Sequence, residues 1–330
     1  MTKKQVVEKI IGAAIAPQKQ KGEAFALSNI ALCKYWGKRN SELNLPINSS
    51  LSVSLGHLGT NTQIARHEKR DKTLLNGSEL ASTAKFATRL SSYLDLFRPT
   101  SDFFFHIETT NNFPTAAGLA SSASGYAALA MALNDFFGWD LDNKKLSILA
   151  RIGSGSASRS LYNGFVEWHA GAAETGMDSY AEQIPVEWPE LRLAVVTVSS
   201  HTKPIGSTEG MKRTVETSTL YKSWPEKAAR DIEHIRAAIQ NKDFELLGGT
   251  AESNALAMHA TMIDTQPSVL YWLPETVATF HKIWQLRQDG LALYFTIDAG
   301  PNVKVLFQSQ DENIVQNEFK ESEIIRPFSS

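Results

Sequence analysis

Hydrophobic and polar residues alternate in several short segments of the first half of the chain. Residues 47–58, INSSLSVSLGHL, alternate serine with leucine or valine, and this period of two predicts a half-buried strand. Residues 23–38 and 102–113 are also predicted strands. The dipeptide Asn76-Gly77 is typical of a tight two-residue hairpin. We therefore expect a β-sheet in the first half.

Apolar residues with helical spacing separate these strands and dominate the second half. In the first half, helices are predicted over residues 6–11, 83–97, 122–137 and 143–153. In the second half, a strand over 191–200 precedes helices over 226–240, 243–262 and 274–288 and a closing hairpin over 291–307. This order predicts helices layered on an antiparallel sheet, an α+β fold, with a domain boundary near residue 190.

Composition and charge narrow the class of protein. The chain has 330 residues, 42% of them hydrophobic and 21% charged, and a net charge of −2, so its overall charge does not favour nucleic acid or an anionic membrane. The single cysteine, Cys33, excludes an intramolecular disulfide. The charged residues Glu8 and Lys9 interrupt the apolar N-terminal stretch, and no apolar run reaches the roughly 18 residues of a membrane helix. We expect a cytoplasmic protein without a membrane segment.

The loop that precedes the helix over 122–137 has the composition of an anion site. Residues 111–133, NNFPTAAGLASSASGYAALAMAL, bring small residues, Gly118 and the hydroxyls of Ser121 and Ser122 to a helix start, where free N–H groups and the helix dipole favour an anion. The segment lacks the G-K-[S/T] of a Walker A loop. From composition alone, close packing of a small-residue helix on a sheet explains the pattern equally well.

Three further segments contain candidate functional side chains, each with a simpler structural explanation. GSGSASR, residues 153–159, offers hydroxyls and the planar guanidinium of Arg159, or is a flexible surface loop. KYWGKR, residues 34–39, offers three cations beside two aromatic rings, which also suits single-stranded nucleic acid or a protected sheet edge; if it is a strand, Lys34 and Lys38 face opposite to Tyr35. IDAGPNV, residues 297–303, contains Asp298 in a typical turn sequence.

The order of five segments carries more information than any one of them. The segments are NIALCKYWGKRNSELNLPINSSLSVSL, NNFPTAAGLASSASGYAAL, GSGSASRSLYNGFVEW, STEGMKRTVETS and DAGPNVKVL. In this order they closely resemble the diphosphomevalonate decarboxylase family, which belongs to the superfamily of galactokinase, homoserine kinase, mevalonate kinase and phosphomevalonate kinase. The resemblance runs from about residue 24 to residue 307.

The resemblance implies a fold, an activity and partners. The fold would be a two-domain, small-molecule-kinase-like α+β fold with its active site in the inter-domain cleft. Its parts would be an N-terminal extension over 1–23, an ATP-binding domain over 24–190 and a C-terminal α+β domain over 191–330. The activity would be ATP-dependent decarboxylation of mevalonate 5-diphosphate to isopentenyl diphosphate, ADP, phosphate and CO2, a step of isoprenoid biosynthesis, with ATP and Mg²⁺ as cofactors. A homodimer that binds neither nucleic acid nor membrane is also implied.

The resemblance also implies roles for individual residues. Catalytic roles fall to Asp298 and Arg159. The ATP phosphates would be bound by Pro114, Ala117, Gly118, Leu119, Ala120, Ser121 and Ser122, with Ser122 as a ligand of Mg²⁺. The substrate would be bound by Lys34, Tyr35, Lys38, Ser154, Gly155, Ser156, Arg159, Ser207 and Thr208.

Three alternatives remain open from the sequence. A related decarboxylase would use mevalonate 5-phosphate, and a related kinase would phosphorylate the 3-hydroxyl and stop. The presence of both Asp298 and Arg159 argues against the kinase, whereas Lys34 and Lys38 only suggest room for the larger negative charge of a diphosphate. A non-catalytic nucleic-acid-binding module is the alternative from another class. The residues of the loop SHTKPIG, 200–206, are not matched to the family pattern.

Overall fold

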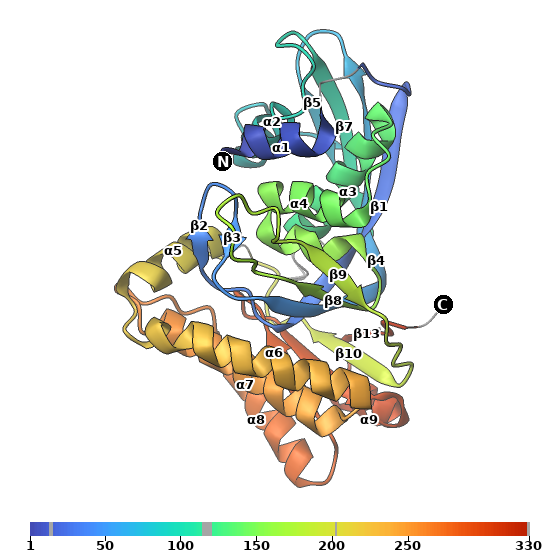
Figure 1. Ribbon diagram of the computed structural model, residues 1–330. Helices are drawn as coiled ribbons and strands as arrows, with labels where there is room; N and C mark the ends of the chain where they lie inside the picture. The colour runs from blue at the N-terminus through green and yellow to red at the C-terminus, as the bar shows by residue number, and fades with distance from the viewer. Residues whose placement is uncertain (13–15, 114–120, 202, 329–330) are drawn as a thin grey trace.

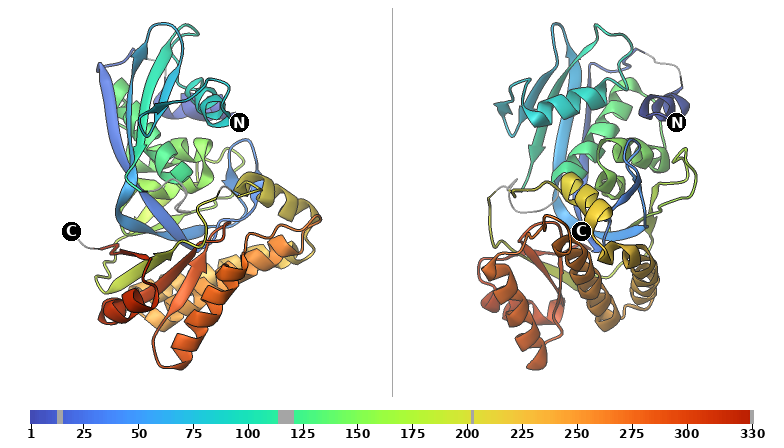
Figure 2. Two further views of the ribbon diagram at one scale, coloured as in Figure 1. Left: turned by 180° about the vertical axis from the view of Figure 1, so that it is seen from behind. Right: turned by 90° about the vertical axis from the view of Figure 1, so that its left-hand side faces the viewer.

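The described part of the chain contains two larger β-sheets, one above the other in Figure 1 and each covered by helices, and one separate pair of short strands. The computed structural model describes residues 1–12, 16–113, 121–201 and 203–328. In both further views the second sheet and its helices remain below the first, and the described C-terminal end lies near the junction of the two parts (Figure 2). The mixture of sheets and helices confirms the predicted α+β class.

The first sheet is formed entirely by residues of the first half. Its order is β6-β5-β7-β4-β8-β9, with β1 also paired with β4, and every pair is antiparallel except β5 and β7. The strands are β1 (Lys21–Cys33), β4 (Ser50–His67), β5 (Lys72–Leu75), β6 (Ser78–Glu79), β7 (Phe104–Asn111), β8 (Phe165–Trp168) and β9 (Ala181–Ile184). The short strands β2 (Lys38–Asn40) and β3 (Leu45–Pro46) form a separate pair.

Helices cover the first sheet and bring three chain segments together. They are α1 (Lys3–Ile11), α2 (Lys85–Leu94), α3 (Ser121–Phe137), α4 (Asn143–Gly153) and the 3₁₀ helix η1 (Gly155–Leu161). Helix α3 packs on β1 and β4 and contacts both α4 and η1. Most side chains of α3 are alanine or another small residue, so the helix approaches the sheet closely. Within residues 153–159, predicted as a loop or helix start, Gly153 ends α4 and Gly155 begins η1, which contacts α3.

The second sheet and its helices are formed by the second half. The antiparallel order is β11-β12-β10-β13, with β10 (Leu191–Val196), β11 (Tyr294–Ile297), β12 (Val303–Gln308) and β13 (Glu323–Ile325). The helices are α5 (Ser207–Thr217), η2 (Leu220–Ser223), α6 (Trp224–Asn241), α7 (Phe244–Ile263), α8 (Pro274–Gln288), η3 (Ser309–Asp311) and α9 (Glu312–Glu318). Helices α6, α7 and α8 confirm the three long helices predicted from the sequence, and α7 and α8 both contact β11.

A shared hydrophobic core joins the two halves. Leu51 and Val53 of β4 belong to the same buried cluster as Trp224 and Ile232 of α6 and Met258 of α7. Burial of apolar surface is the main favourable term in such an interface. The junction between the halves is therefore a packed interface, and side chains that point into it are held from both sides.

The N-terminal extension folds as a short amphipathic helix. Thr2 and Gln5 form a capping box at the start of α1, and Val6, Val7 and Ile10 are buried. The helix contacts α4. None of the helices in the described part of the chain has the length and apolar character needed to cross a membrane.

The hairpin predicted at Asn76-Gly77 is confirmed. The two residues have φ angles of 50° and 79° and connect β5 to β6. Positive φ at both central positions is the requirement of a type I′ turn, which Asn-Gly satisfies best.

Residues 47–58 are predicted to be a half-buried strand, and this prediction is wrong about how much of the strand is buried. Residues 50–55 of β4 are all buried, including Ser50, Ser52 and Ser54. The leucine and valine side faces the shared core, while Ser50 and Ser54 accept hydrogen bonds from Arg159 and from the backbone of Gly164. Ser50 and Ser54 thus make buried polar contacts, and none of the three serines faces solvent.

The predicted strand over 23–38 is also wrong at its end. Strand β1 stops at Cys33, and residues 34–37 leave the sheet. Lys34 is 2% exposed, and the ring of Tyr35 is also largely covered, so these neighbours do not alternate between solvent and core. The strand predicted over 191–200 likewise ends earlier, at Val196.

Candidate active site

A lysine and an aspartate from opposite halves of the chain meet at the junction. Lys34 follows the last residue of β1, and Asp298 follows the last residue of β11. Although 264 positions separate them, Lys34 Nζ lies 2.7 Å from Asp298 Oδ1. The side chain of Lys34 is 2% exposed and that of Asp298 is 31% exposed. The carboxylate of Asp298 therefore remains accessible to a ligand, while Lys34 stays buried and holds the carboxylate through the ion pair.

Several cations determine the charge of this carboxylate. Burial alone would raise the pKa of Asp298, but Lys34, Lys304 and Arg159 outweigh it and lower the pKa to about 2. Burial lowers the pKa of Lys34, and Asp298 opposes this effect. Asp298 is consequently ionised at neutral pH.

Arg159 is buried in η1 close to this pair. Its Nη1 donates to Ser50 Oγ at 2.6 Å and its Nε donates to Asn29 Oδ1 at 3.4 Å, and the side chain is 3% exposed. Within the described residues no carboxylate lies at ion-pair distance from Arg159. Burial lowers its pKa to about 10, so it stays protonated at neutral pH. A buried guanidinium paired only with neutral groups is suited to bind an anionic ligand.

The segments around Tyr35 and Gly155 contact each other. A Cβ atom added to Gly155 would lie 2.9 Å from Tyr35 Cε1, so only glycine lets the two segments approach this closely. Ser154 Oγ and Ser156 Oγ are 3.4 Å apart on either side of this glycine. The hydroxyl of Tyr35 is buried and has no hydrogen-bond partner among the described residues. An unpaired buried hydroxyl is costly unless a ligand completes it.

Two of the predicted substrate residues lie apart from these contacts. Lys38 Nζ donates to Asn44 Oδ1 at 2.7 Å, and burial together with Lys3 and Arg89 lowers its pKa to about 8. Thr208 is exposed at the start of α5. In the described part of the chain neither makes a hydrogen bond to another predicted site residue.

Lys203 connects Ser207 to the loop of Asp298. Lys203 Nζ donates to Ser207 Oγ at 2.9 Å and to the carbonyl oxygen of Ala299 at 2.7 Å. Burial lowers the pKa of Lys203 and Asp298 raises it. Sequence reasoning did not assign this residue, because SHTKPIG could not be matched position by position. The only sequence feature that could have pointed to Lys203 is its position shortly before the segment STEGM.

Two more side chains next to Asp298 were not assigned a role from the sequence. His259 is buried, and its Nε2 lies 3.0 Å from the backbone oxygen of Asp298, with a pKa that burial lowers to about 3. Lys304 is 1% exposed on β12, donates to the Asn302 oxygen at 3.1 Å and has a pKa that burial lowers to about 8. A lysine inside the apolar run VKVLF was the signal available for Lys304.

The predicted ATP loop is described only at its end. Pro114, Ala117, Gly118, Leu119 and Ala120 lie outside the described residues. Ser121 and Ser122 form the first turn of α3 and line a small pocket with Phe86, Leu90 and Tyr126. In residues 1–12, 16–113, 121–201 and 203–328, no group of three or more His, Cys, Asp or Glu side chains is arranged to hold a metal ion.

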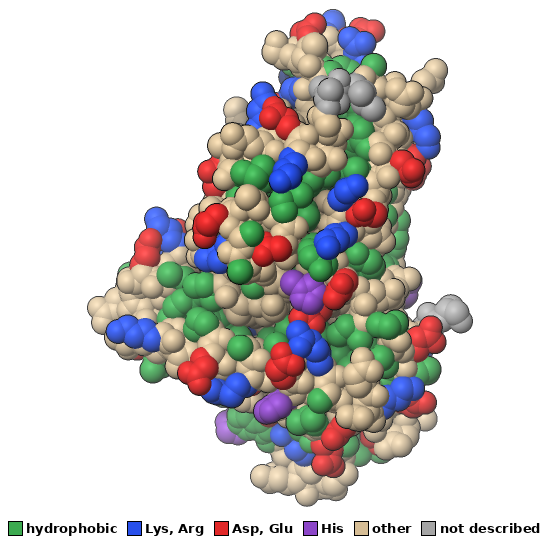
Figure 3. Space-filling view, viewed as in Figure 1, with side chains coloured by type: hydrophobic (Ala, Val, Ile, Leu, Met, Phe, Trp, Pro, Cys, Tyr) green, Lys and Arg blue, Asp and Glu red, His purple; other side chains and the backbone are tan. Residues whose placement is uncertain are grey.

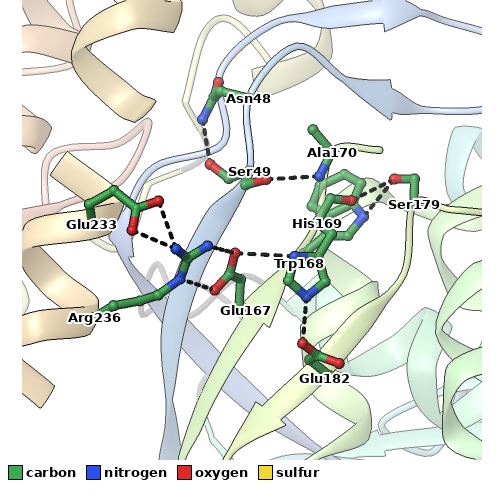
Figure 4. A network of polar contacts seen from close by, with 10 residues as sticks. All are labelled: Asn48, Ser49, Glu167, Trp168, His169, Ala170, Ser179, Glu182, Glu233 and Arg236. Carbon is green, nitrogen blue, oxygen red and sulfur yellow. Dashed lines mark hydrogen bonds and ion pairs between the residues drawn. The ribbon is translucent and has the colours of Figure 1, made fainter. Parts of the chain in front are cut away.

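A polar network beside the site connects α6 to the first sheet (Figure 4). Arg236 donates to both oxygens of Glu167 at 2.7 and 2.6 Å and also contacts Glu233. His169 lies 3.2 Å from Glu167 through Nδ1 and 2.8 Å from Glu182 through Nε2. Glu167 is 4% exposed on its side chain, so a buried carboxylate lies at the centre of this connection between the halves, with partly exposed partners around it.

Two family models match consecutive parts of the chain. Residues 26–181 match the diphosphomevalonate decarboxylase-like N-terminal domain, and residues 193–324 match the mevalonate 5-diphosphate decarboxylase C-terminal domain. The chain is 41% identical to the diphosphomevalonate decarboxylase of Bos taurus over 301 residues, which cover 84% of this chain and 74% of the relative. It is 38% identical to that of Saccharomyces cerevisiae over 307 residues, which cover 86% and 77%.

Solved structures agree with this match. The mevalonate diphosphate decarboxylase of Enterococcus faecalis is 40% identical, with a TM-score of 0.87 over 94% of this chain and 98% of that one. The enzyme of Staphylococcus aureus is 38% identical, with a TM-score of 0.87 over 94% and 96%. These values confirm the predicted two-domain, small-molecule-kinase-like fold. With both halves matched in order and at this level of identity, the chain belongs to the diphosphomevalonate decarboxylase family.

Proposed function

We propose that the protein catalyses the ATP-dependent decarboxylation of mevalonate 5-diphosphate to isopentenyl diphosphate, releasing ADP, phosphate and CO2. Family membership supports this, and one similar solved structure, with a TM-score of 0.86 and 40% identity, is described as a complex with MVAPP, AMPPCP and magnesium. The observation that carries the proposal is the meeting of an ionised Asp298, supported by Lys34, with a buried Arg159 that has no carboxylate partner among the described residues.

The first chemical step would phosphorylate the 3-hydroxyl of the substrate. A tertiary hydroxyl is a poor leaving group, whereas phosphate is a good one. Asp298 would accept a hydrogen bond from the hydroxyl and take its proton while the oxygen bonds to the γ-phosphorus and the bond to ADP breaks. Because its pKa is about 2, Asp298 is ionised before the reaction and can accept the proton of the hydroxyl as the new phosphorus–oxygen bond forms.

The second step would release phosphate and CO2. When the C3–O bond breaks, positive charge develops at C3, and the bond between C2 and the carboxylate supplies the electrons of the new double bond. Arg159 would hold that carboxylate. Its guanidinium already donates to Ser50 and Asn29, so its direction is fixed before substrate binds. A single orienting contact would leave the carboxylate electrons available for bond cleavage.

Lys34, Tyr35, Lys38 and residues 154–156 would bind the rest of the substrate. The buried Tyr35 hydroxyl, without a partner among the described residues, would donate to a substrate oxygen. Ser207, held by Lys203 beside the Asp298 loop, would contact a phosphate, as would Thr208. The ammonium groups of Lys34 and Lys38 would balance the negative charge of the substrate diphosphate.

ATP would bind with its phosphates at the start of α3. Ser121 and Ser122 present hydroxyls in the first turn, and Ser122 is the proposed protein ligand of Mg²⁺. Mg²⁺ commonly takes most of its ligands from phosphates and water, which fits a chain whose described residues hold no cluster of three metal-binding side chains. The ion supplies neutralisation of phosphate charge when it is bound.

The test is a comparison of two substrates with the purified protein. Mevalonate 5-diphosphate and mevalonate 5-phosphate are each supplied with MgATP, and ADP and CO2 are followed together. We expect equal amounts of ADP and CO2, with kcat/KM at least tenfold higher for the diphosphate. A higher kcat/KM for mevalonate 5-phosphate would show that the monophosphate is the substrate. Formation of ADP without CO2 would indicate a kinase.

We also propose domain limits, a homodimer and a cytoplasmic location. The segment between β9 and β10 joins the two sheets, which supports domains over 24–190 and 191–330 after an extension over 1–23. Leu270, Leu273 and Val277 are exposed apolar side chains near the start of α8, where a second copy would cover them. Light scattering should give twice the mass of one chain.

The face of the molecule in Figure 3 mixes basic and acidic side chains. That face presents no continuous basic surface of the kind that binds a nucleic-acid backbone. Cell fractionation tests the proposed cytoplasmic location.

A further inference from the structure

The backbone of Lys34 is held by two asparagine side chains. At this position the chain has left β1, whose last pair is Cys33 with Leu51. The N–H of Lys34 donates to Asn254 Oδ1 at 2.8 Å, and its carbonyl oxygen accepts from Asn48 Nδ2 at 2.9 Å. The two groups that a strand would have paired are therefore satisfied from α7 and from the loop before β4.

The orientation of the Asn254 amide is fixed by Asp231. Asn254 Nδ2 donates to Asp231 Oδ2 at 2.7 Å, and Lys227 Nζ donates to both oxygens of Asp231 at 3.0 and 2.9 Å. Asn254 is 0% exposed and Asp231 is 6% exposed. Since an ionised carboxylate only accepts hydrogen bonds, the amide nitrogen must face Asp231 and the amide oxygen must face Lys34.

Asn48 is fixed in the same way from the other side. Its Oδ1 accepts from Trp224 Nε1 at 3.1 Å, and Trp224 Nε1 also donates to the Trp36 oxygen at 3.0 Å. Asn48 also donates to the backbone oxygen of its neighbour Ser49 (Figure 4). The Lys34 backbone is thus held by side chains of α7 and of the loop before β4, and residues of α6 orient both of these side chains.

The anchoring of the Lys34 backbone determines where its side-chain ammonium lies. The position of Lys34 Nζ, 2.7 Å from Asp298 Oδ1, depends on where its backbone is anchored. Asn254 comes from α7, the helix that also packs against β11, which ends immediately before Asp298. Asn254 therefore links the lysine to α7, a helix that packs against the strand preceding Asp298.

We propose that Asn254, oriented by Asp231, is a positioning residue that places Lys34 against Asp298 for the reaction. The inference rests on the proposed function, because its kinetic readout is turnover of mevalonate 5-diphosphate. Asn254 touches neither the substrate nor the reacting atoms in this assignment and acts only through Lys34. An error of about 1 Å in such placement costs on the order of 100-fold in rate.

The first test replaces the side chain and measures kcat and KM separately. Asn254→Ala is compared with Asn241→Ala, which removes an exposed asparagine from the end of α6. We expect kcat to fall on the order of 100-fold in Asn254→Ala, with KM for ATP within about threefold of wild type. Asn241→Ala should match wild type. A folded Asn254→Ala variant with kcat within about threefold of wild type would overturn the proposal.

A charge swap keeps the proposal testable if the alanine variant does not fold. Asn254→Asp still accepts from Lys34 but sets a second carboxylate against Asp231, so kcat should fall. Adding Asp231→Asn restores the hydrogen bond between positions 231 and 254 with donor and acceptor exchanged, while the Lys34 N–H still donates to the side chain at position 254. We expect the double variant to recover at least about tenfold in kcat over Asn254→Asp. A double variant that is no faster, or that does not fold, contradicts the assignment.

Hydrogen exchange separates this proposal from the proposed function. Amide exchange over residues 30–40 should be faster in Asn254→Ala than in wild type and unchanged in Asn241→Ala. If wild type does not turn over mevalonate 5-diphosphate but this exchange difference is present, the proposed function fails and the anchoring of Lys34 stands. If wild type is active and the exchange is unchanged, the anchoring fails alone.

Discussion

The connection from Arg236 to Glu167 should contribute measurably to the stability of the whole molecule. The pair joins α6 to β8, and it is bidentate, with distances of 2.7 and 2.6 Å. Arg236→Ala removes the guanidinium and leaves Glu167, which is 4% exposed on its side chain, with His169 Nδ1 at 3.2 Å as its remaining side-chain partner. A buried carboxylate that loses its partner is strongly destabilising.

The pKa of Glu167 gives the size of the effect. Burial alone would raise this pKa, but hydrogen bonds from Arg236 and His169 lower it from 4.5 to about 2. At about 1.4 kcal/mol per pH unit, this fall corresponds to roughly 3 kcal/mol. Arg236 is 38% exposed, so solvent screening reduces its share, and we expect Arg236→Ala to lose about 2 kcal/mol. For a chain of this length that is a fall of about 3 °C in Tm.

The assay is thermal unfolding at pH 7, with a matched variant of the same helix. Arg230→Ala removes an exposed arginine whose partner, Glu226, is also exposed. Surface pairs of this kind contribute about 0–1 kcal/mol, so its Tm should stay near that of wild type. If Arg236→Ala melts within about 1 °C of wild type, the buried pair does not hold the halves together and the reasoning is refuted.

Three further results are expected. Arg159→Lys keeps the charge but loses the planar fork, so turnover should fall by about 100-fold and KM for mevalonate 5-diphosphate should rise while calorimetry gives an unchanged Kd for ATP; selective loss of ATP affinity would show that η1 has another role. Gly37→Ala should lower Tm strongly, because φ is +101° and the new Cβ would lie 1.7 Å from Tyr221 Oη; an unchanged melting curve would contradict this contact. The hydrogen bond with Glu167 raises the pKa of His169, so the stability it provides is complete below pH of about 6.5 and is lost as the pH rises through the folded-state pKa. His169→Gln should remove this pH dependence of the unfolding free energy, measured from pH 6 to 9. An unchanged pH dependence would show that another group causes it.

Local structure was largely predictable from the sequence. The Asn76-Gly77 turn and the helices α6, α7 and α8 follow from residues that are neighbours along the chain, where turn chemistry and helical spacing act directly. The α+β class followed from the order of these elements. The set of candidate site residues came from the family resemblance and not from periodicity.

What the sequence did not predict depends on contacts between distant residues. Strand β1 ends at Cys33 because the backbone of Lys34 finds its partner in Asn254, 220 positions away. Ser50 and Ser54 of β4 are buried because Arg159 and the backbone of Gly164 reach them from segments more than 100 positions later. No window of the sequence contains both members of these pairs.

The most direct test of the central claim, that Asp298 acts on a substrate bound between the two halves, is the turnover of Asp298→Asn with mevalonate 5-diphosphate and MgATP. The variant keeps the size of the side chain and loses its charge. We predict a loss of roughly 1000-fold or more in kcat, together with a Kd for ATP within about threefold of wild type by calorimetry. Turnover close to that of wild type would contradict the account.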